Sequence, residues 1–326
     1  MTARIHVMAA AVVDADGRIL IAQRSAGAHL GGLWEFPGGK REAGESREQA
    51  LARELDEELG IQVVDAEPLI CVAHDYPDRQ VLLDVWRVTR WQGELYPREG
   101  QPLVWAQLHE MTNYNFPAAD VPVLLALGLP NRYLITPSPG ADPEEWLAGL
   151  AASLRQGISL IQIRAPDLEG SEFETLAAKA VAVCRQHSED IQVLVNSDPR
   201  VARACGADGV HLNHRRLWAA TAESFNNGLL VAASCHNTAD LHQARNVGAD
   251  FAVLGPVKGT LSHPGAEVLG WQQYAQLLDD AAIPVYALGG MSEGDLKHAI
   301  QVGSQGVAAI RDFWGGPISP DTGACP

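Results

Sequence analysis

The stretch that decides the first half of the fold is Gly39–Ile61, which reads GKREAGESREQALARELDEELGI. If its central part is helical, Glu54, Glu57 and Glu58 lie within about 100° of arc on one side. The leucines form a separate stripe that can pack against a core, at Leu51, Leu55 and Leu59. One short helix would therefore carry an apolar face and a crowded acidic face.

The acidic face has two interpretations. A charge-rich helix is usually a solvated surface, and Arg53 with Glu57 makes an ordinary i,i+4 pair. Like charges this close nevertheless repel one another unless a cation lies between them. Carboxylate oxygens are ligands that Mg²⁺ prefers, and Mg²⁺ commonly bridges them to substrate phosphates. The helix is therefore a candidate wall of a Mg²⁺ site, with Glu54 as either a ligand or a base.

Composition narrows the class of protein. The chain has 326 residues, enough for two domains with separate cores, and its 47% apolar content is typical of globular proteins. A net charge of −16 argues against binding to a nucleic-acid polymer. No apolar run is long enough for a membrane span, no signal-peptide pattern is present, and the scattered cysteines fit a reducing compartment. We therefore expect a cytoplasmic protein without a membrane partner.

The first half of the chain mixes strands with helices. Apolar segments predict strands at 5–13, 19–22, 81–88 and 103–107, and a closing helix at 121–127. This α+β pattern indicates a mixed sheet. A segment punctuated by Pro and Gly, 128–131, then ends the first domain, which we place at residues 1–130.

From Tyr133 onward, short apolar strands alternate with helices, which is an α/β pattern. The predicted strands are 133–136, 160–164, 193–196, 209–212, 230–234, 251–255, 284–289 and 306–310. The predicted helices include 144–156, 172–187, 238–247 and 293–302. This pattern predicts a (β/α)₈ TIM barrel at residues 131–314, followed by a flexible Gly- and Pro-rich tail at 315–326.

The opening stretch, with Gly39, Glu45 and the run Arg53–Ile61, resembles the Nudix box at every defined position. The resemblance extends over roughly residues 4–128 to MutT-type 8-oxo-dGTP diphosphatases. Its further segments are QRSAGAH (23–29), EFPGG (35–39), YPDR (76–79), REGQP (98–102) and FPAAD (116–120). It implies an α/β/α sandwich that hydrolyses a small-molecule nucleotide to a monophosphate and pyrophosphate, as in nucleotide-pool sanitation and DNA repair.

The resemblance also implies roles for the acidic residues. Mg²⁺, with Mn²⁺ as the alternative ion, would be held by the carbonyl of Gly38 and the carboxylates of Glu54, Glu57, Glu58 and Glu99. The metal would neutralise the phosphates and lower the pKa of a bound water. Glu54 would take the proton of that water, Arg53 would orient Glu54, and Glu45 would pair with Arg53. By its own position, Glu99 is better interpreted as an exposed loop carboxylate, and only its matching context, EGQP, supports the ligand role.

The base pocket is implied in the same way. The positions that match nucleotide contacts are Arg24, His29, Glu35, Phe36, Pro37, Gly38, Arg79 and Asp120. Phe36 would supply a flat apolar wall for a purine. Asp120 departs from the MutT pattern, which has asparagine there. An ionised aspartate only accepts hydrogen bonds, so it suits N7–H of 8-oxoguanine but opposes O6, unless a raised pKa lets it hold a proton.

The second half resembles thiamine phosphate synthase and thiazole tautomerase over about residues 132–312. The matching segments are QIR (162–164), GADGVHL (206–212), GAD (248–250), GP (255–256) and IPVYALGG (283–290). The resemblance implies a thiazole or thiamine phosphate ligand, contacted by Gln162, Arg164, Asn196, His236, Gly289 and Gly290. The two glycines also lie where (β/α)₈ barrels bind phosphate.

Departures from the synthase pattern argue against synthase activity. Its metal-binding Asn-Asp pair appears here as Asn196-Ser197, and its second acidic ligand position holds Arg216. An arginine there reverses the charge beside the ion, and Asp198 is the nearest substitute for Ser197. The expected lysine after Arg164 is absent, and the loop after the sixth strand reads TLSH at 260–263. We therefore expect the barrel to lack this activity.

Several functions remain open. The barrel could be a tautomerase-like enzyme in which His236 acts as acid or base, a sensor of a phosphate ligand, or a structural partner of the first domain. His236 could equally be a barrel-mouth histidine bonded to its neighbours. For the whole chain, the alternative to an 8-oxo-dGTP diphosphatase is a thiamine-pathway bifunctional protein whose first half hydrolyses damaged thiamine diphosphate. The MutT-type pocket favours the diphosphatase, and the sequence indicates no oligomeric state.

Overall fold

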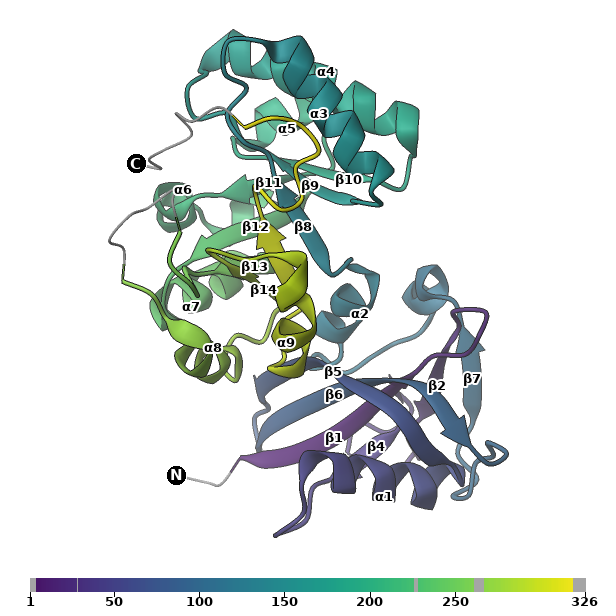
Figure 1. Ribbon diagram of the computed structural model, residues 1–326. Helices are drawn as coiled ribbons and strands as arrows, with labels where there is room; N and C mark the ends of the chain where they lie inside the picture. The colour runs from purple at the N-terminus through teal and green to yellow at the C-terminus, as the bar shows by residue number, and fades with distance from the viewer. Residues whose placement is uncertain (1–3, 28, 226–227, 261–266, 319–326) are drawn as a thin grey trace. The chain divides into compact units, whose positions relative to one another are not determined.

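The computed structural model describes residues 4–27, 29–225, 228–260 and 267–318 (Figure 1). It has two compact units, and the main division between them along the chain falls between Gly128 and Leu129. Most of the predicted tail, 319–326, and most of the TLSH loop lie outside the described residues. Within the described part, no helix combines the length and the apolar character needed to span a membrane.

The first unit contains two sheets. The larger has the order β4–β1–β6–β5, with β1 parallel to β6 and the other neighbours antiparallel. The smaller is antiparallel, in the order β3–β2–β7. The elements are β1 (Ile5–Val12), β2 (Ile19–Gln23), β3 (Trp34–Glu35), β4 (Gly38–Lys40), α1 (Arg47–Leu59), β5 (Gln62–Asp75), β6 (Gln80–Gln92), β7 (Leu103–Ala106), the 3₁₀-helix η1 (Leu108–Asn113) and α2 (Val121–Gly128).

Alternation along β1 places the two α-helices on opposite faces of the larger sheet. Its even-numbered residues pack with the leucines of α1: Met8, Ala10 and Val12. Its odd-numbered residues Ala9 and Ala11 join the other apolar cluster, which contains Val123 and Ala126 of α2. A central strand that is buried on both faces must be apolar throughout, as this one is. The predicted α/β/α sandwich with a mixed sheet is therefore confirmed.

Helix α1 begins and ends at residues suited to those positions. The hydroxyl of Ser46 accepts from the N–H of Gln49 at 3.1 Å, and the Gln49 side chain accepts from the N–H of Ser46 at 2.8 Å. Gly60 ends the helix in the left-handed region, with φ of 71°. Its leucine stripe is fully buried, so the glutamates project from the opposite side.

Strand β5 is the main element that the sequence pattern did not predict. It spans 14 residues, Gln62–Asp75, and pairs antiparallel with β6. Its register shifts near Asp65 and again near Pro68, which hides any simple alternation of polar and apolar residues. As an edge strand, it tolerates proline and bulges because one side of its backbone pairs with no neighbouring strand of the sheet.

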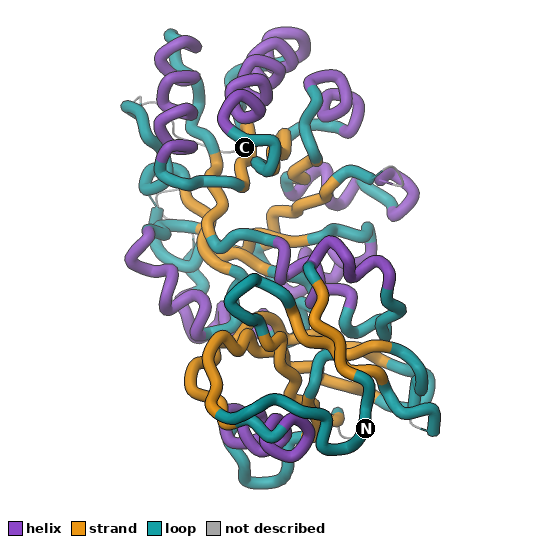
Figure 2. The backbone as a smooth tube through the Cα atoms, turned by 90° about the vertical axis from the view of Figure 1, so that its right-hand side faces the viewer, coloured by secondary structure: helices purple, strands orange, loops and turns teal. Residues whose placement is uncertain are grey.

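The second unit is a closed barrel of parallel strands, β8 to β15, with its helices outside the ring of strands (Figure 2). The elements are β8 (Arg132–Ile135), α3 (Pro143–Arg155), β9 (Leu160–Ile163), α4 (Gly170–His187), β10 (Gln192–Val195), α5 (Pro199–Cys205), β11 (Gly209–Leu212), α6 (His214–Ala219), η2 (Ala222–Phe225), β12 (Leu230–Cys235), α7 (Thr238–Asn246), β13 (Phe251–Leu254), α8 (Gly270–Leu278), β14 (Val285–Leu288), η3 (Glu293–Asp295), α9 (Leu296–Gln301) and β15 (Gly306–Ala309). Each predicted strand overlaps one of these, so the predicted (β/α)₈ barrel is confirmed. The helices named from the sequence correspond to α3, α4, α7 and η3 with α9, and α5, α6 and α8 are further helices between the strands.

Aromatic residues fill the barrel interior. Tyr133, Phe251 and Tyr286 are fully buried, with ring centroids 5.4 to 5.6 Å apart. Leu129 packs into the same cluster, and its carbonyl accepts from the side-chain amide of Gln305 at 2.9 Å. The chain thus enters the barrel core at Leu129, slightly before the boundary expected at residue 130.

Candidate active site and barrel mouth

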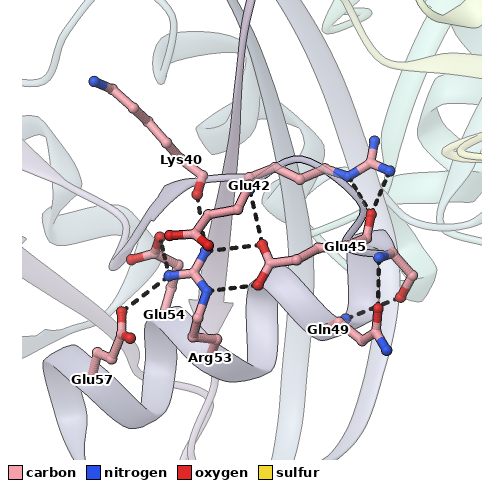
Figure 3. A network of polar contacts seen from close by, with 9 residues as sticks. Lys40, Glu42, Glu45, Gln49, Arg53, Glu54 and Glu57 are labelled. Carbon is pink, nitrogen blue, oxygen red and sulfur yellow. Dashed lines mark hydrogen bonds and ion pairs between the residues drawn. The ribbon is translucent and has the colours of Figure 1, made fainter.

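The acidic face of α1 is organised around one guanidinium, that of Arg53 (Figure 3). Its Nε and Nη2 donate to the two carboxylate oxygens of Glu45 at 2.7 and 3.0 Å. Its Nη1 donates to Glu54 at 2.8 Å and to Glu57 at 3.0 Å. The hydrogen bonds from Arg53 lower the pKa of Glu45 to about 2. Since Nη2 also donates to the carbonyl of Lys40 at 3.0 Å, this side chain fixes the preceding loop on the helix.

Glu58 lies in a more buried part of the same face. Its carboxylate accepts from the backbone N–H of Gly38 at 3.0 Å. Burial raises the pKa of Glu58 to about 8. Three nearby carboxylates raise this pKa further: Glu35, Glu99 and Glu54. Because these groups oppose one another's ionisation, a cation among them would stabilise the ionised forms.

Glu99 reaches this cluster through the loop that follows β6. The N–H of Arg98 donates to the carbonyl of Glu58 at 2.9 Å, and the side chain of Gln101 donates to the same carbonyl at 3.2 Å. These bonds tie the loop to the C-terminal end of α1. The exposed carboxylate of Glu99, which only the family resemblance singled out, therefore lies close enough to influence Glu58.

The donor set fits a hard divalent cation by its chemistry, because every candidate ligand is an oxygen. A Cβ at Gly39 would lie 2.3 Å from a carboxylate oxygen of Glu54, so only glycine lets this carboxylate approach the backbone so closely. Among the described residues, however, no group of three or more His, Cys, Asp or Glu side chains is arranged as a metal site. Arg53 holds Glu54 and Glu57, so cation binding requires these carboxylates to exchange contacts.

A cavity of about 320 Å³ lies beside Gly38 and Glu58. The predicted substrate residues that line it are Arg24, His29, Glu35, Phe36, Gly38, Arg79 and Asp120. Pro37 is buried and does not line it, and its carbonyl accepts from the N–H of Ala10 at 2.8 Å. The same cavity therefore contacts the acidic face of α1 and the residues expected to bind the base.

Asp120 is the most deeply buried polar residue of this cavity, with 5% of its surface exposed. Burial raises its pKa to about 8, with a further increase from the carboxylate of Glu35 and an opposing effect of Arg24. The backbone N–H of Phe36 donates to the Asp120 carboxyl group. At neutral pH the side chain therefore holds a proton, so it can both donate and accept a hydrogen bond.

Arg24 connects two other pocket residues. It forms an ion pair with Glu35, and its Nε donates to the carbonyl of His29 at 2.8 Å. The His29 ring lies edge-on to Tyr76, with centroids 5.5 Å apart. Nε2 of His29 is buried and has no hydrogen-bond partner within the described residues, which leaves it available to a polar group of a ligand.

Much of the remaining wall of the cavity is apolar. Phe36 is 2% exposed and stacks on Phe116 with centroids 5.9 Å apart, so little of its ring is left for a ligand. Arg79 is held by Asp78 at 2.6 and 2.9 Å. The sequence analysis did not predict the lining residues Ile5, Val7, Ala9, Tyr76, Val81 and Leu83. Five of them alternate along β1 and β6, so strand periodicity alone could have indicated them.

A chain of hydrogen bonds crosses the barrel interior near the carboxyl ends of its strands. Gln162 donates to the hydroxyl of Tyr133 at 3.4 Å, and that hydroxyl lies 3.0 Å from Nδ1 of His211. Nε2 of His211 lies 2.8 Å from the hydroxyl of Ser234. Burial lowers the pKa of His211 to about 3, so the ring is neutral and links the two hydroxyls. The amide of Asn196 donates to Gln162 at 3.1 Å and extends the chain.

His236 and two glycines lie at the same end of the barrel. Nδ1 of the exposed His236 lies 2.7 Å from the carbonyl of Gly255, so Nδ1 carries a proton and donates to this oxygen. Gly289 and Gly290 have φ of 93° and 64°, and a Cβ at Gly289 would lie 2.5 Å from Pro256. These positions therefore require glycine.

Comparison with known proteins assigns both units. A model of the thiamine monophosphate synthase family matches residues 132–313, and a NUDIX domain model matches residues 8–126. An 8-oxo-dGTP diphosphatase of Proteus vulgaris is 47% identical over 97 residues, which cover 30% of this chain and 87% of that protein. A CTP pyrophosphohydrolase of Escherichia coli (strain K12) is 44% identical over 117 residues, 36% of this chain and 87% of that protein. A putative thiamine-phosphate synthase 2 of Aquifex aeolicus (strain VF5) is 32% identical over 185 residues, 57% of this chain and 98% of that protein.

The first unit is thus a Nudix domain of the MutT-like kind, a hydrolase that acts on phosphoanhydrides. Through its second unit, the chain belongs to the thiamine monophosphate synthase family. Both resemblances found in the sequence are confirmed.

Proposed function

We propose that the first domain is a Mg²⁺-dependent diphosphatase that converts 8-oxo-dGTP to 8-oxo-dGMP and pyrophosphate. The observation that carries this proposal is the single cavity lined by both Glu58 and Asp120. A nucleotide in this cavity can have its phosphates beside the glutamates of α1 and its base beside Asp120. The 8-oxo-dGTP diphosphatases among the relatives support this substrate. The reaction would remove an oxidised nucleotide before it enters DNA.

The residues of α1 divide the chemistry between them. The proposed ligands of Mg²⁺, or of Mn²⁺, are the carbonyl of Gly38 and the carboxylates of Glu54, Glu57, Glu58 and Glu99. The ion supplies neutralisation of phosphate charge and a lowered pKa for a bound water. Glu54 takes a proton from the attacking water, and Arg53 orients Glu54. Glu45 holds Arg53 in place through its bidentate pair.

Asp120 recognises the oxidised base through its own proton. In 8-oxoguanine, N7 carries a hydrogen and O6 is an acceptor, so a neutral carboxyl group matches both positions. Unmodified guanine has an acceptor at N7 instead, which leaves two acceptors facing each other. Such an unpaired buried group costs about 1–3 kcal/mol, which corresponds to a preference of roughly 10-fold or more. The raised pKa therefore lets aspartate replace asparagine at this position.

Pyrophosphate release by the full chain tests this proposal, with 8-oxo-dGTP, dGTP, CTP and thiamine diphosphate analogues as substrates. We expect kcat/KM for 8-oxo-dGTP to exceed that for dGTP by about tenfold or more. Asp120→Ala should remove most of this preference, and Asp120→Asn should keep it. Equal kcat/KM values for the two guanine nucleotides would exclude Asp120 from base recognition. Preferred hydrolysis of CTP would favour the activity named for the E. coli relative instead.

We also propose that the barrel does not join a pyrimidine pyrophosphate to a thiazole phosphate. Ser197 and Arg216 stand where that reaction's metal ligands are expected, and the carboxylate of Asp198 caps α5. The exposed ring of His236, oriented by the Gly255 carbonyl at the barrel mouth, favours a tautomerase-like role or ligand binding over the purely structural alternative. Robust synthase turnover by the purified chain would contradict this proposal.

A further inference from the structure

The mouth of the barrel carries two half-buried guanidinium groups that lack a carboxylate partner. Arg164 directly follows β9, and Arg216 lies in α6, after β11. Among the described residues, neither forms an ion pair with an aspartate or a glutamate, whereas Arg185 and Arg200 of the same unit both do. Two partly desolvated cations without a paired carboxylate are unfavourable unless an anion joins them.

Arg216 is held in place by a neutral partner. Its Nη1 donates to the side-chain oxygen of Asn196 at 3.0 Å and to the Asn196 carbonyl at 3.3 Å. No hydrogen bond of its Nε or Nη2 is formed within the described part of the chain, so these donors remain for a ligand. Burial lowers the pKa of Arg216, the charge of Arg215 adds to this effect, and the carboxylate of Asp198 opposes it. The site therefore holds an oriented guanidinium whose charge is only partly compensated.

Arg164 approaches the same place from the neighbouring strand. Alternation along β9 puts Arg164 on the same face as Gln162, whose side chain points into the barrel. Burial lowers the pKa of His211, and the charge of Arg164 adds to this effect. Gln162, on the same face as Arg164, is bonded to Asn196, and Asn196 is bonded to Arg216, so one pair of amides connects the two positions.

The nearby carboxylates are already engaged elsewhere. Asp198 accepts from the backbone N–H of Arg200 at 2.9 Å and of Val201 at 3.3 Å, and it pairs with the Arg200 side chain at 3.2 Å. Asp240 is 1% exposed and accepts from the indole of Trp218 and the N–H of His236, both at 2.9 Å. The side-chain oxygen of Asn196 is bonded to a cation already. This donor set does not fit a divalent metal.

We propose that the mouth of the barrel binds a phosphate-bearing small molecule without a metal ion, with Arg164 and Arg216 supplying the positive charge. Guanidinium groups match phosphate oxygens with paired N–H donors, and burial strengthens each contact. In this chain, Arg216 takes the place of the ion. The inference concerns the second domain alone and does not depend on the diphosphatase proposal.

Calorimetric titration of the full chain with inorganic phosphate, inorganic pyrophosphate and acetate, in the presence of EDTA, tests this inference. We expect phosphate or pyrophosphate to bind without added metal, and acetate to bind at least about tenfold more weakly. Arg216→Gln and Arg164→Gln should each weaken the binding by about tenfold or more. Arg215→Gln is the matched control, because it removes the same charge from an exposed neighbour and should change affinity by less than about threefold.

Several results would contradict metal-free phosphate binding at the barrel mouth. Binding that requires Mg²⁺, that Arg216→Gln leaves intact, or that acetate matches would each overturn the inference. If circular dichroism shows that Arg216→Gln does not fold, Arg216→Lys decides, because it keeps the charge and should retain measurable binding. Loss of all binding in a folded Arg216→Lys protein would also contradict it. The hydrolysis of 8-oxo-dGTP should be unchanged in these variants, so failure here is distinguishable from failure of the proposed function.

Discussion

The acidic face of α1 and the mouth of the barrel address the same electrostatic problem with opposite charges. On α1, burial raises the pKa of Glu58 to about 8, and neighbouring carboxylates raise it further. A nearby positive charge would lower this pKa, so the described residues leave this part of the acidic face without a cation. At the barrel mouth, Arg216 is bonded to an uncharged amide, and burial lowers its pKa, so the region lacks negative charge. The missing charge indicates the ligand: a cation in the first region and an anion in the second.

The charge of the surrounding side chains also decides whether a phosphate site requires a metal ion. A phosphate bound among carboxylates requires an ion between the two negative groups. A phosphate bound among guanidinium groups does not, because the protein carries the positive charge itself. Metal dependence should therefore separate the two domains within one chain.

The largest effect is expected from the acidic region. Glu58→Gln and Glu54→Gln should each lower diphosphatase turnover by about 100-fold or more, as for other losses of metal or acid–base groups. The fold should survive, because glutamine can still accept from Gly38 and the leucine stripe is untouched. Glu48→Gln, on an exposed position of the same helix, is the control. Steady-state rates with Mg²⁺ near wild type for both variants would mean that α1 holds no metal.

The next effect concerns Leu129, the residue at which the second unit begins. Leu129 is 7% exposed within the barrel cluster, and its carbonyl accepts from Gln305. A barrel fragment that starts at Leu129 should therefore be more stable than one that starts at Asn131, by about 2 kcal/mol. Urea unfolding of the two fragments measures this difference. Equal stabilities would show that Leu129 contributes nothing to the barrel.

A smaller effect is expected from pH. Asp120 is protonated below its pKa of about 8 and ionised above it, where it opposes O6 of the base. The kcat/KM of wild type for 8-oxo-dGTP, divided by that of Asp120→Asn, should fall by roughly tenfold as pH rises through this range. The ratio removes every titration that the two proteins share, including those of the α1 glutamates. A ratio that stays constant would mean that Asp120 does not contribute a proton.

Much of this architecture could be predicted from the sequence. The barrel strands are short apolar runs at regular spacing, and a parallel sheet that is buried on both faces requires such runs. The glutamate helix was equally clear, because its acidic and leucine stripes have the same period. Strand β5 was not predicted because its register shifts near Asp65 and Pro68 remove the alternation of polar and apolar residues that indicates a strand.

The decisive features of the sites depend on contacts between distant residues. The pKa of Asp120 follows from burial and from Glu35, which is far away in the sequence. Glu99 approaches Glu58 only because the loop of Arg98 and Gln101 is bonded to the end of α1. The sequence showed that Arg216 stands at an unexpected position, but not that Asn196 orients it.

The smallest effect distinguishes a cap from a ligand at Asp198. Asp198 is the nearest carboxylate that could replace Ser197 as a metal ligand, yet it caps α5 and pairs with Arg200. Asparagine caps helices about as well as aspartate, so Asp198→Asn should change the free energy of unfolding by only a few tenths of a kcal/mol. Its negative charge opposes an anion beside Arg216, so its removal should tighten pyrophosphate binding in EDTA by a factor of about two. Weaker binding by Asp198→Asn in EDTA would contradict this repulsion. Binding that Mg²⁺ strengthens in the wild type but not in Asp198→Asn would make Asp198 a metal ligand. The barrel mouth would then bind its anion through a metal ion, as proposed for the acidic face of α1, and the two regions would no longer differ in metal dependence.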